Sequence, residues 1–340
     1  MCGITQIVWN RTERRIRAGW RILLHFGLWG SAQIISGLII GSPVAIGLTK
    51  VLPGLQPIID SLLFALLNLT LVVVATLVMA LYIDRRPIRA IGLQFDPAWW
   101  SDLGFGLVLG ALLMAGIFMT EWLLGWVSVV ALFSAGLPNQ PWAIMIWQPL
   151  VLFIVVGISE ELLSRGYQLR NFAEGLATAM HRRPVAVVVA WLLSSILFGL
   201  LHIFNPNSSW RSTLGLVLVG GGWGVGYLLT GRLGISIGLH ITWNFFQGNV
   251  FGFPVSGNVL SPATVIQIQQ HGPPSWTGGA FGPEAGLMGV VAILLGTLLT
   301  YWWVQHTYGE VRIQLALADY LPRNATVAPS DPHPAQQIRN

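Results

Sequence analysis

Two adjacent glutamates and an arginine lie inside an apolar stretch of this sequence, where ionisable side chains are candidate functional groups by default. On a helix, Glu161 and Arg165 share a face because residues four apart are neighbours, and they can neutralise each other. Glu160 is turned about 100° away from that pair. A carboxylate without a local partner suits a general base near neutral pH. The alternative is a buried ion pair with a spare carboxyl near the water interface.

A histidine follows on a second apolar segment. Phe198 and His202 are four residues apart, so the ring can cover one side of the imidazole. Glu160 lies 22 residues before Arg182, near the turn between the two segments, and His202 lies 20 residues after it. Two antiparallel helices would therefore place Glu160 and His202 opposite each other. A histidine that only bonds a neighbouring helix is the alternative.

This arrangement requires the first helix to extend beyond the membrane. The polar residues Arg170, Glu174 and His181 are consistent with such an extension. We therefore expect one long helix rather than a helix that ends close to Arg165.

A third segment places His240 and Asn244 on one helical face. Two neutral donors at this spacing could stabilise a developing oxyanion, which is often the largest single catalytic contribution. The alternative is an interhelical hydrogen bond, worth roughly 1 kcal/mol in a membrane protein.

The composition places these segments in a membrane. The chain has 340 residues, 54% of them hydrophobic and only 9% charged, whereas a soluble domain carries about 25% charged residues. This excludes a soluble globular enzyme, a disordered protein and a typical nucleic-acid binder. The single cysteine, Cys2, excludes a disulfide framework and a cysteine-based metal cluster.

We predict an all-α, multi-pass helical bundle with about eight spans, because each span needs about 20 apolar residues. The predicted spans are 21–49, 56–83, 102–127, 144–165, 185–204, 213–230, 233–252 and 285–304. The arginines support this layout, because 15 of the 18 basic residues fall on one side of it. The positive-inside rule then places both termini in the cytoplasm.

The same layout divides the chain into three parts. Residues 1–20 form a basic cytoplasmic segment, 21–304 form the membrane domain with its motif core at about 145–250, and 305–340 form a disordered cytoplasmic tail. Glycine pairs such as Gly234 and Gly238 indicate close helix packing.

In this order the three segments resemble the CAAX prenyl protease and bacteriocin-processing family (CPBP, or Abi), which consists of intramembrane glutamate proteases. The pattern consists of Glu160-Glu161-x-x-x-Arg165, Phe198-x-x-x-His202 and His240-x-x-x-Asn244. The resemblance covers about residues 145–250, and the eight-helix layout extends it along the chain. Ser164 departs from the pattern, since many members have an aromatic residue there, and this leaves the substrate class open.

The resemblance implies a role for each matching position. Glu160 would activate the attacking water and His202 would help to hold it. His240 and Asn244 would form the oxyanion hole. The supporting positions would be Glu161, Arg165 and Phe198. The substrate would be a membrane-associated protein or peptide, lipidated or not, in the cell membrane of a prokaryote, and no cofactor or nucleic acid would be involved.

Two other classes stay open. Glu160, His202 and His240 could instead bind zinc as a two-histidine, one-carboxylate set, although no His-Glu-x-x-His motif is present. A transporter, immunity factor or scaffold could use the same buried groups without cleaving anything.

Overall fold

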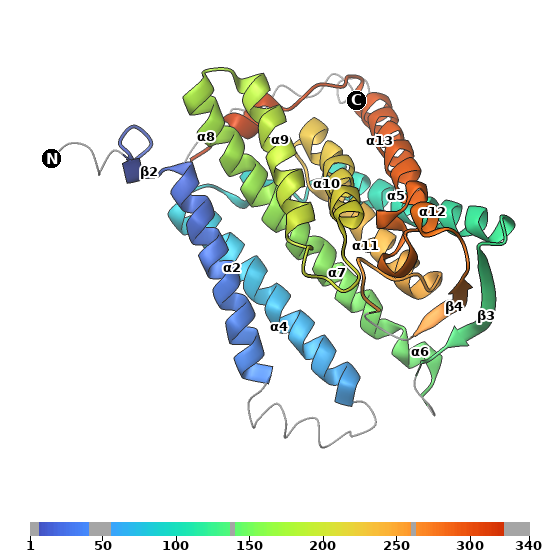
Figure 1. Cartoon of the computed structure of the whole chain (residues 1–340). Helices are drawn as coiled ribbons and strands as arrows, with labels where there is room; N and C mark the ends of the chain where they lie inside the picture. The colour runs from blue at the N-terminus through green and yellow to red at the C-terminus, as the bar shows by residue number, and fades with distance from the viewer. Residues whose placement is uncertain (1–6, 41–55, 137–139, 260–262, 323–340) are drawn as a thin grey trace.

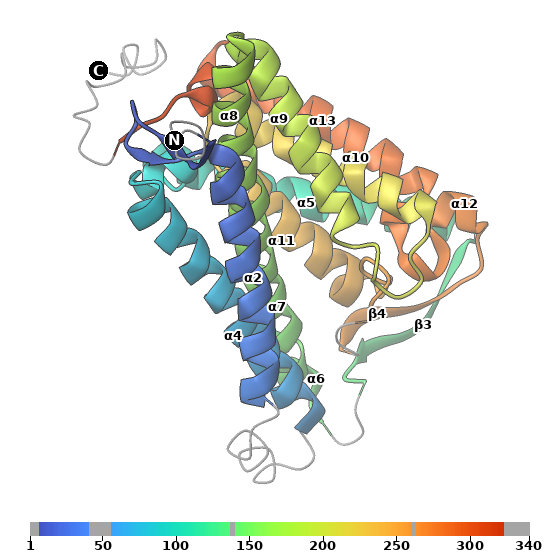
Figure 2. The same cartoon turned by 60° about the vertical axis from the view of Figure 1, so that its left-hand side comes forward.

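The structure is a computed structural model that describes residues 7–40, 56–136, 140–259 and 263–322. Its long helices pack side by side into a bundle, with α7 and α11 inside it (Figures 1 and 2). The long helices are α2 (Ala18–Ile40), α4 (Gln56–Val78), α5 (Pro97–Leu123), α7 (Trp147–Glu161), α8 (Arg170–Met180), α9 (Arg183–Leu200), α10 (Trp210–Thr230), α11 (Gly234–Phe245) and α13 (Leu287–Tyr308).

Short elements join these helices. They are α6 (Trp142–Met145), α12 (Pro274–Thr277), the π-helical segments η2 (Met79–Ile83), η4 (Leu162–Leu169) and η5 (Phe246–Val250), and the 3₁₀ turns η3 (Ile88–Ile91), η6 (Gly279–Phe281), η7 (Pro283–Ala285) and η8 (Leu315–Ala318). The predicted all-α class is confirmed, and each predicted span coincides with helix over most of its described residues.

Six helices of the described chain are long and apolar enough to cross a membrane. In the second predicted span, the apolar helix whose side chains are described throughout is Leu69–Ile83, the end of α4 together with η2, and α11 is short and almost wholly buried. The protein is therefore a multi-pass membrane protein, while the count of eight spans stays a prediction.

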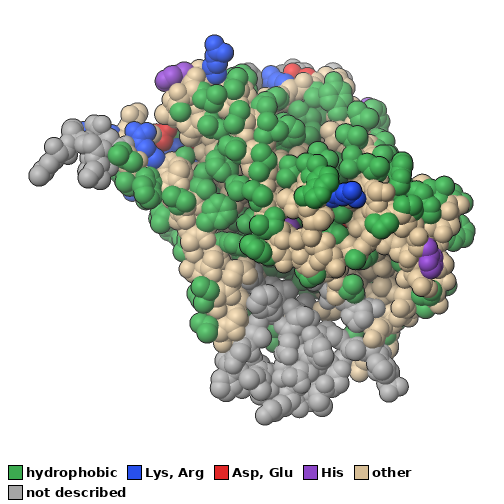
Figure 3. All heavy atoms as spheres, viewed as in Figure 1, with side chains coloured by type: hydrophobic (Ala, Val, Ile, Leu, Met, Phe, Trp, Pro, Cys, Tyr) green, Lys and Arg blue, Asp and Glu red, His purple; other side chains and the backbone are tan. Residues whose placement is uncertain are grey.

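Hydrophobic side chains cover much of the visible face, and the charged ones gather mainly at the end where β2 and α8 lie (Figure 3).

Glycines allow α5 and α11 to cross closely. A Cβ added at Gly234 would lie 2.5 Å from the carbonyl oxygen of Trp99, and one at Gly238 would lie 2.3 Å from that of Leu103. The approach is equally close from the side of α5, where a Cβ added at Gly106 would lie 2.3 Å from the carbonyl oxygen of Ile235 on α11. The small residues thus bring two backbones together, as their spacing indicated, and this fixes the helix that carries His240.

Two small antiparallel sheets accompany the helices. β1 (Trp9–Asn10) pairs with β2 (Arg15–Ile16), and β3 (Val127–Ser134) pairs with β4 (Thr264–Gln270). The segment between the predicted spans 233–252 and 285–304 therefore contains a strand and short helical turns. A strand forms there because β3 offers an extended partner for its backbone groups.

Two predicted boundaries need correction. Residues 305–322 are not a disordered tail, because α13 continues to Tyr308 and η8 packs Leu317 and Ala318 into the core. Arg170 also donates from Nη2 to the backbone oxygens of Ala316 and Asp319. At the other end, α2 begins at Ala18 and the ribbon before it is packed. Residues 1–6 and 323–340 lie outside the described residues.

Candidate active site

One long helical rod, Trp142–Met180, positions both glutamates of the first motif. It changes from α-helix to π-helix at Leu162, directly after Glu161, and returns to α-helix at Arg170. π-helical segments inside α-helices are frequent at functional sites. The hydroxyl of Ser164 donates to the backbone oxygen of Glu160 at the start of this segment. The extension through Glu174 that the sequence predicted is present, and the rod stops at His181, which has a left-handed backbone.

A buried charged cluster supports the site. Nη1 of Arg165 lies 2.8 Å from Oε1 of Glu161, which is the predicted pair four residues apart. The same Oε1 accepts from Nδ1 of His240 at 2.9 Å. Nη2 of Arg165 donates to the backbone oxygen of Gly220 on α10 at 2.7 Å. Because a buried ion pair needs further hydrogen bonds to offset desolvation, these contacts fix α7, α10 and α11 against one another.

Glu160 points away from this pair and faces two imidazoles. Its Oε2 lies 3.9 Å from Nε2 of His202 and 3.9 Å from Nε2 of His240. These separations are too long for direct hydrogen bonds and match groups that a bridging water joins. The Glu160 side chain is 31% exposed, whereas that of Glu161 is fully buried. The structure therefore brings Glu160, His202 and His240 together from three helical segments.

The hydrogen bonds of the two imidazoles determine which ring nitrogens face Glu160. Nδ1 of His202 lies 2.7 Å from the backbone oxygen of Phe198, which can only accept. Nδ1 of His240 is engaged in the same way by the Glu161 carboxylate. In the neutral form of each ring, Nδ1 holds the proton and Nε2 presents a lone pair. Both lone pairs are thus available next to Glu160.

Aromatic rings cover the sides of this group. The Phe198 ring centroid lies 5.0 Å from that of His202, as the four-residue spacing predicted, and 6.2 Å from that of His240. The Arg165 guanidinium lies 4.6 Å from the same ring centre. The Trp223 ring lies 4.4 Å from His240. These rings pack against the imidazoles and restrict their orientation.

A cavity of about 270 Å³ opens beside Glu160 and His202. Its polar lining includes Ser159, Ser164 and Asn205, and its outer part is formed by α2 and α4. The lining residues contributed by these two helices are Trp29, Gln33, Leu69 and Val72. A peptide reaching Glu160 through this cavity would pass between apolar and polar walls.

Asn244 is placed differently from the other motif residues. It lies one turn beyond His240 on α11 and is 7% exposed. Among the described residues, no hydrogen bond joins its side chain to Glu160, His202 or His240. Two further ionisable residues of the predicted spans, His25 and Glu121, do not line the cavity.

Three features of the site were not predicted from the sequence. The bond from His240 to Glu161 and the carbonyl of Gly220 depend on helix packing, so no local spacing signals them. Asn205 lies three residues after His202, and its Nδ2 donates to the backbone oxygen of Ser256 at 2.9 Å. Its closeness to His202 in the chain was the available signal.

Within the described chain, no group of three or more His, Cys, Asp or Glu side chains is arranged to hold a metal ion.

The fold and site together define a multi-pass membrane protein with a cavity between its helices that polar and apolar side chains line together. Residues 141–246 match the family model described as "Rce1-like: Type II CAAX prenyl endopeptidase Rce1-like". This segment contains all three motifs, and the match confirms the resemblance to the CAAX protease family. The family implies a membrane-embedded protease of CAAX type that acts on a peptide substrate in the bilayer. No curated protein and no solved structure matched the chain.

Proposed function

We propose that this protein is an intramembrane endopeptidase in which Glu160 activates a water for attack on a peptide bond. The observation that supports this most strongly is the 3.9 Å gap between Oε2 of Glu160 and Nε2 of each histidine. A water between Glu160 and His202 would donate one hydrogen to Oε2 of Glu160 and the other to the Nε2 lone pair of His202, since both atoms accept. Its oxygen would then present a lone pair to the substrate carbonyl carbon.

The proton balance of the reaction follows from this arrangement. As the C–O bond forms, Glu160 takes the proton from the attacking water and acts as general base. The tetrahedral intermediate collapses when the C–N bond breaks and the proton passes from Glu160 to the leaving amine. No covalent bond to the enzyme forms, and no cofactor is needed in this scheme.

His240 and Asn244 are proposed to hold the developing oxyanion. His240 already donates from Nδ1 to Glu161, so it can donate from Nε2 only as an imidazolium. The adjacent Glu161 carboxylate would stabilise that cation. Asn244 would have to turn toward the substrate oxygen, which fits a donor that tightens only when substrate is bound.

Zinc binding by Glu160, His202 and His240 is a second candidate. These side chains would have to move closer together to bind the ion, but one observation favours it. Zinc-binding histidines donate their other ring N–H to a carboxylate or backbone oxygen, and both histidines do so here. The two candidates differ in their response to metal removal. A chelator leaves the glutamate mechanism unchanged and abolishes cleavage by a zinc enzyme.

The proposal is tested by cleavage of membrane-associated peptides by the purified chain in lipid. We expect Glu160→Gln to lower the cleavage rate by about 10²- to 10⁴-fold, which is the usual contribution of a general base. The same loss is expected for His202→Ala. Glu121→Gln is the matched control, because Glu121 is buried in α5 and does not line the cavity. Equal cleavage by all variants would show that the site is not catalytic and favour a transporter, immunity factor or scaffold.

The substrate and orientation also belong to this proposal. We expect the substrate to be a membrane-associated protein or peptide. Cleavage of the same peptide with and without a lipid anchor would show whether the protein recognises the anchor. The arginine distribution supports cytoplasmic termini, and the family resemblance supports a prokaryotic cell membrane. Reporter fusions to the two ends of the chain test the orientation, and activity of both reporters only outside the cytoplasm would contradict it.

A further inference from the structure

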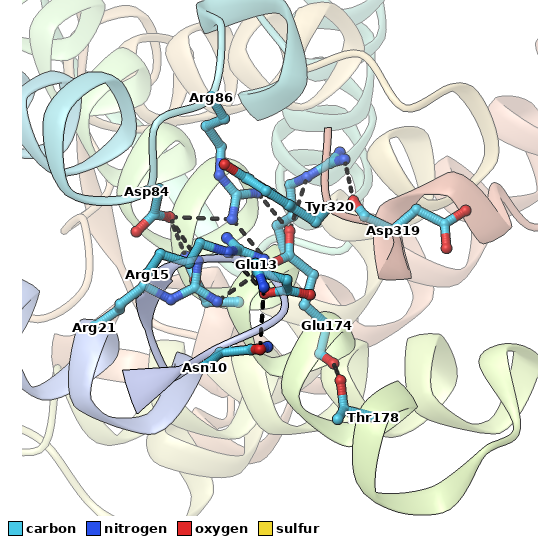
Figure 4. Close-up of polar contacts among 12 residues, drawn as sticks. Asn10, Glu13, Arg15, Arg21, Asp84, Arg86, Glu174, Thr178, Asp319 and Tyr320 are labelled. Atoms are coloured by element: carbon cyan, nitrogen blue, oxygen red, sulfur yellow. Dashed lines mark hydrogen bonds and ion pairs between the residues drawn. The ribbon is translucent and has the colours of Figure 1, made fainter. Parts of the chain in front are cut away.

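A second buried charged cluster lies far along the rod from Glu160, around Glu174 on α8 (Figure 4). The Glu174 carboxylate lies 2.8 Å from Nη2 of Arg15, 3.1 Å from Nη2 of Arg21 and 2.7 Å from Nη1 of Arg86. Asp84 also contacts Arg21 and Arg86, at 3.3 and 3.1 Å. The cluster therefore joins the β1–β2 ribbon, α2, the turn after η2 and α8.

Some cationic N–H groups of this cluster are not satisfied. Arg15 is 1% exposed and Arg21 is 2% exposed, yet Nη1 of Arg15 and Nε of Arg21 have no hydrogen-bond partner among the described residues. Unmade hydrogen bonds of buried groups are costly. An anionic ligand in the cavity that both arginines line would add to the compensation of their charge.

Both arginines line a cavity of about 350 Å³. Arg17 and Asn10 line it too, as do the carboxylates Glu13 and Glu174, which Arg15 contacts at 2.7 and 2.8 Å. The lining thus has three arginines against two carboxylates. Further exposed basic side chains lie in the neighbouring segments, namely Arg11, Arg14, Arg85 and Arg89. The cavity is consequently suited to a negatively charged group.

An apolar groove adjoins this basic cavity. It has a volume of about 530 Å³ and is lined by Ile7, Trp20, Ile22, Leu23 and Phe172, together with Arg17 and Gly19. Arg17 and Gly19 line both spaces, so the groove and the cavity adjoin at these two residues. The groove runs beside the exposed apolar face of α2, which includes Leu24 and Leu28.

We propose that the basic cavity and the apolar groove form a binding site for an anionic phospholipid. The phosphate would lie beside Arg15, Arg17 and Arg21, and an acyl chain would lie in the groove along α2. Arginine suits phosphate because its N–H groups match the phosphate oxygens. A free phosphate would use the cavity and leave the groove unused, so the adjoining apolar groove favours a lipid.

Such a lipid would bridge two elements of the catalytic cavity. α8 belongs to the same rod as Glu160, and α2 contributes Trp29 and Gln33 to the cavity beside it. Occupancy of the lipid site would hold α2 against α8 and therefore fix one wall of that cavity. This inference does not depend on Glu160 being catalytic, because the site is defined by its own residues.

The test is lipid binding by the full chain in neutral detergent, measured by native mass spectrometry and by the thermal unfolding midpoint. The probes are phosphatidylglycerol, phosphatidylcholine with the same acyl chains, and inorganic phosphate. We expect saturable binding and stabilisation by phosphatidylglycerol only. Arg17→Gln should raise its Kd about fivefold, which corresponds to about one arginine near a lipid surface.

Gly19→Leu tests the groove directly. A Cβ at Gly19 meets nothing within 4 Å, so the larger side chain fits the fold and fills the shared space. We expect it to abolish binding of phosphatidylglycerol. Gly27→Leu is the matched control, because Gly27 also lies on α2 with nothing within 4 Å and lines neither space. Arg14→Gln is the matched control for Arg17→Gln, since Arg14 is exposed and lines neither space.

Three results would overturn the proposal. They are equal binding of phosphatidylcholine, full stabilisation by inorganic phosphate, and undiminished binding by Gly19→Leu. If Gly19→Leu does not fold, the pair of arginine variants decides, and equal Kd values for Arg17→Gln and Arg14→Gln would contradict a lipid phosphate at Arg17.

Discussion

Glu160 and Glu174 lie fourteen residues apart on the same helical rod, and their surroundings differ in kind. Glu174 contacts Arg15, Arg21 and Arg86 at hydrogen-bonding distance and has a 5% exposed side chain. Glu160 is 31% exposed, and its nearest charged or titratable partners lie 3.9 Å away. One carboxylate is fully engaged in holding four segments together. The other is held near two imidazoles with space for a reactant between them.

In our proposal, this difference separates a structural carboxylate from a reactive one. At Glu174 the attraction of several cations offsets the desolvation of a buried carboxylate. Near Glu160 that structural task belongs to its neighbour Glu161, which binds Arg165 and His240. Glu160 itself has no ion pair of this kind, so in the proposed mechanism the adjacent glutamates of one motif have opposite roles.

The largest expected effect on stability comes from neutralising Glu174. Glu174→Gln leaves the buried arginines around it without their counter-charge, and removing one partner of a buried pair costs about 3–5 kcal/mol. Glu160→Gln should change the free energy of unfolding by less than about 0.5 kcal/mol, as is usual away from structural contacts. Denaturant unfolding of both variants in the same detergent measures the contrast. Similar losses of stability in the two variants would remove the distinction between the clusters.

A third buried carboxylate extends the comparison to pH. Glu284 is 1% exposed and contacts no cation among the residues that the structure describes, but its carboxylate accepts from Nε2 of Gln247 at 2.7 Å and from the backbone N–H of Ser256 at 3.1 Å. Burial raises the pKa of Glu284 from 4.5 to about 7. Glu284 is therefore protonated in the folded state and ionised in the unfolded state between these two values.

The sign of the pH effect follows from that proton. Because the folded state binds more protons, the contribution of Glu284 to stability is greatest below pH 4.5 and falls as the pH rises toward 7 and above. Glu284→Gln should lack this component. Unfolding free energies of wild type and variant across this range measure the difference, which should be larger at low pH. A difference that stays constant with pH would show that the Glu284 carboxyl does not titrate in this range.

The smallest expected effect concerns the π-helical segment beside Glu160. The Ser164 hydroxyl donates to the Glu160 backbone and accepts from Nη1 of Arg165 at 2.9 Å. Ser164→Ala should destabilise the protein by about 1 kcal/mol more than Ser195→Ala, because both lose a bond to a helix carbonyl and only the first loses a contact with a charged group. Thermal unfolding of the two variants provides the comparison. Identical midpoints would mean that Ser164 does not help to position Arg165.

The sequence predicted the features of the site that depend on local geometry. The pairing of Glu161 with Arg165 follows from their spacing on a helix, and the helix runs on through Glu174 as its polar residues indicated. The meeting of Glu160 with His202 followed from counting residues on two antiparallel helices. Such regularities hold because helix geometry is fixed.

What the sequence did not predict depends on tertiary packing. The bond between His240 and Glu161 requires α11 to cross α7 at one particular height. The cluster at Glu174 joins segments as distant in the chain as Arg15 and Arg86. The ordered segment at η8 looked like a polar tail because its two buried residues, Leu317 and Ala318, make no periodic pattern. Spacing along the chain indicates none of these contacts.

The central claim is that Glu160 activates water without a metal ion, and one measurement tests it most directly. Wild type and Glu160→Gln are freed of metal with a chelator, their metal content is measured, and cleavage of one identified membrane peptide is followed for both in the same bilayer. We predict that metal-free wild type cleaves at its original rate and that Glu160→Gln is about 10²- to 10⁴-fold slower. Loss of wild-type cleavage with restoration by zinc, or unimpaired cleavage by Glu160→Gln, would contradict the account.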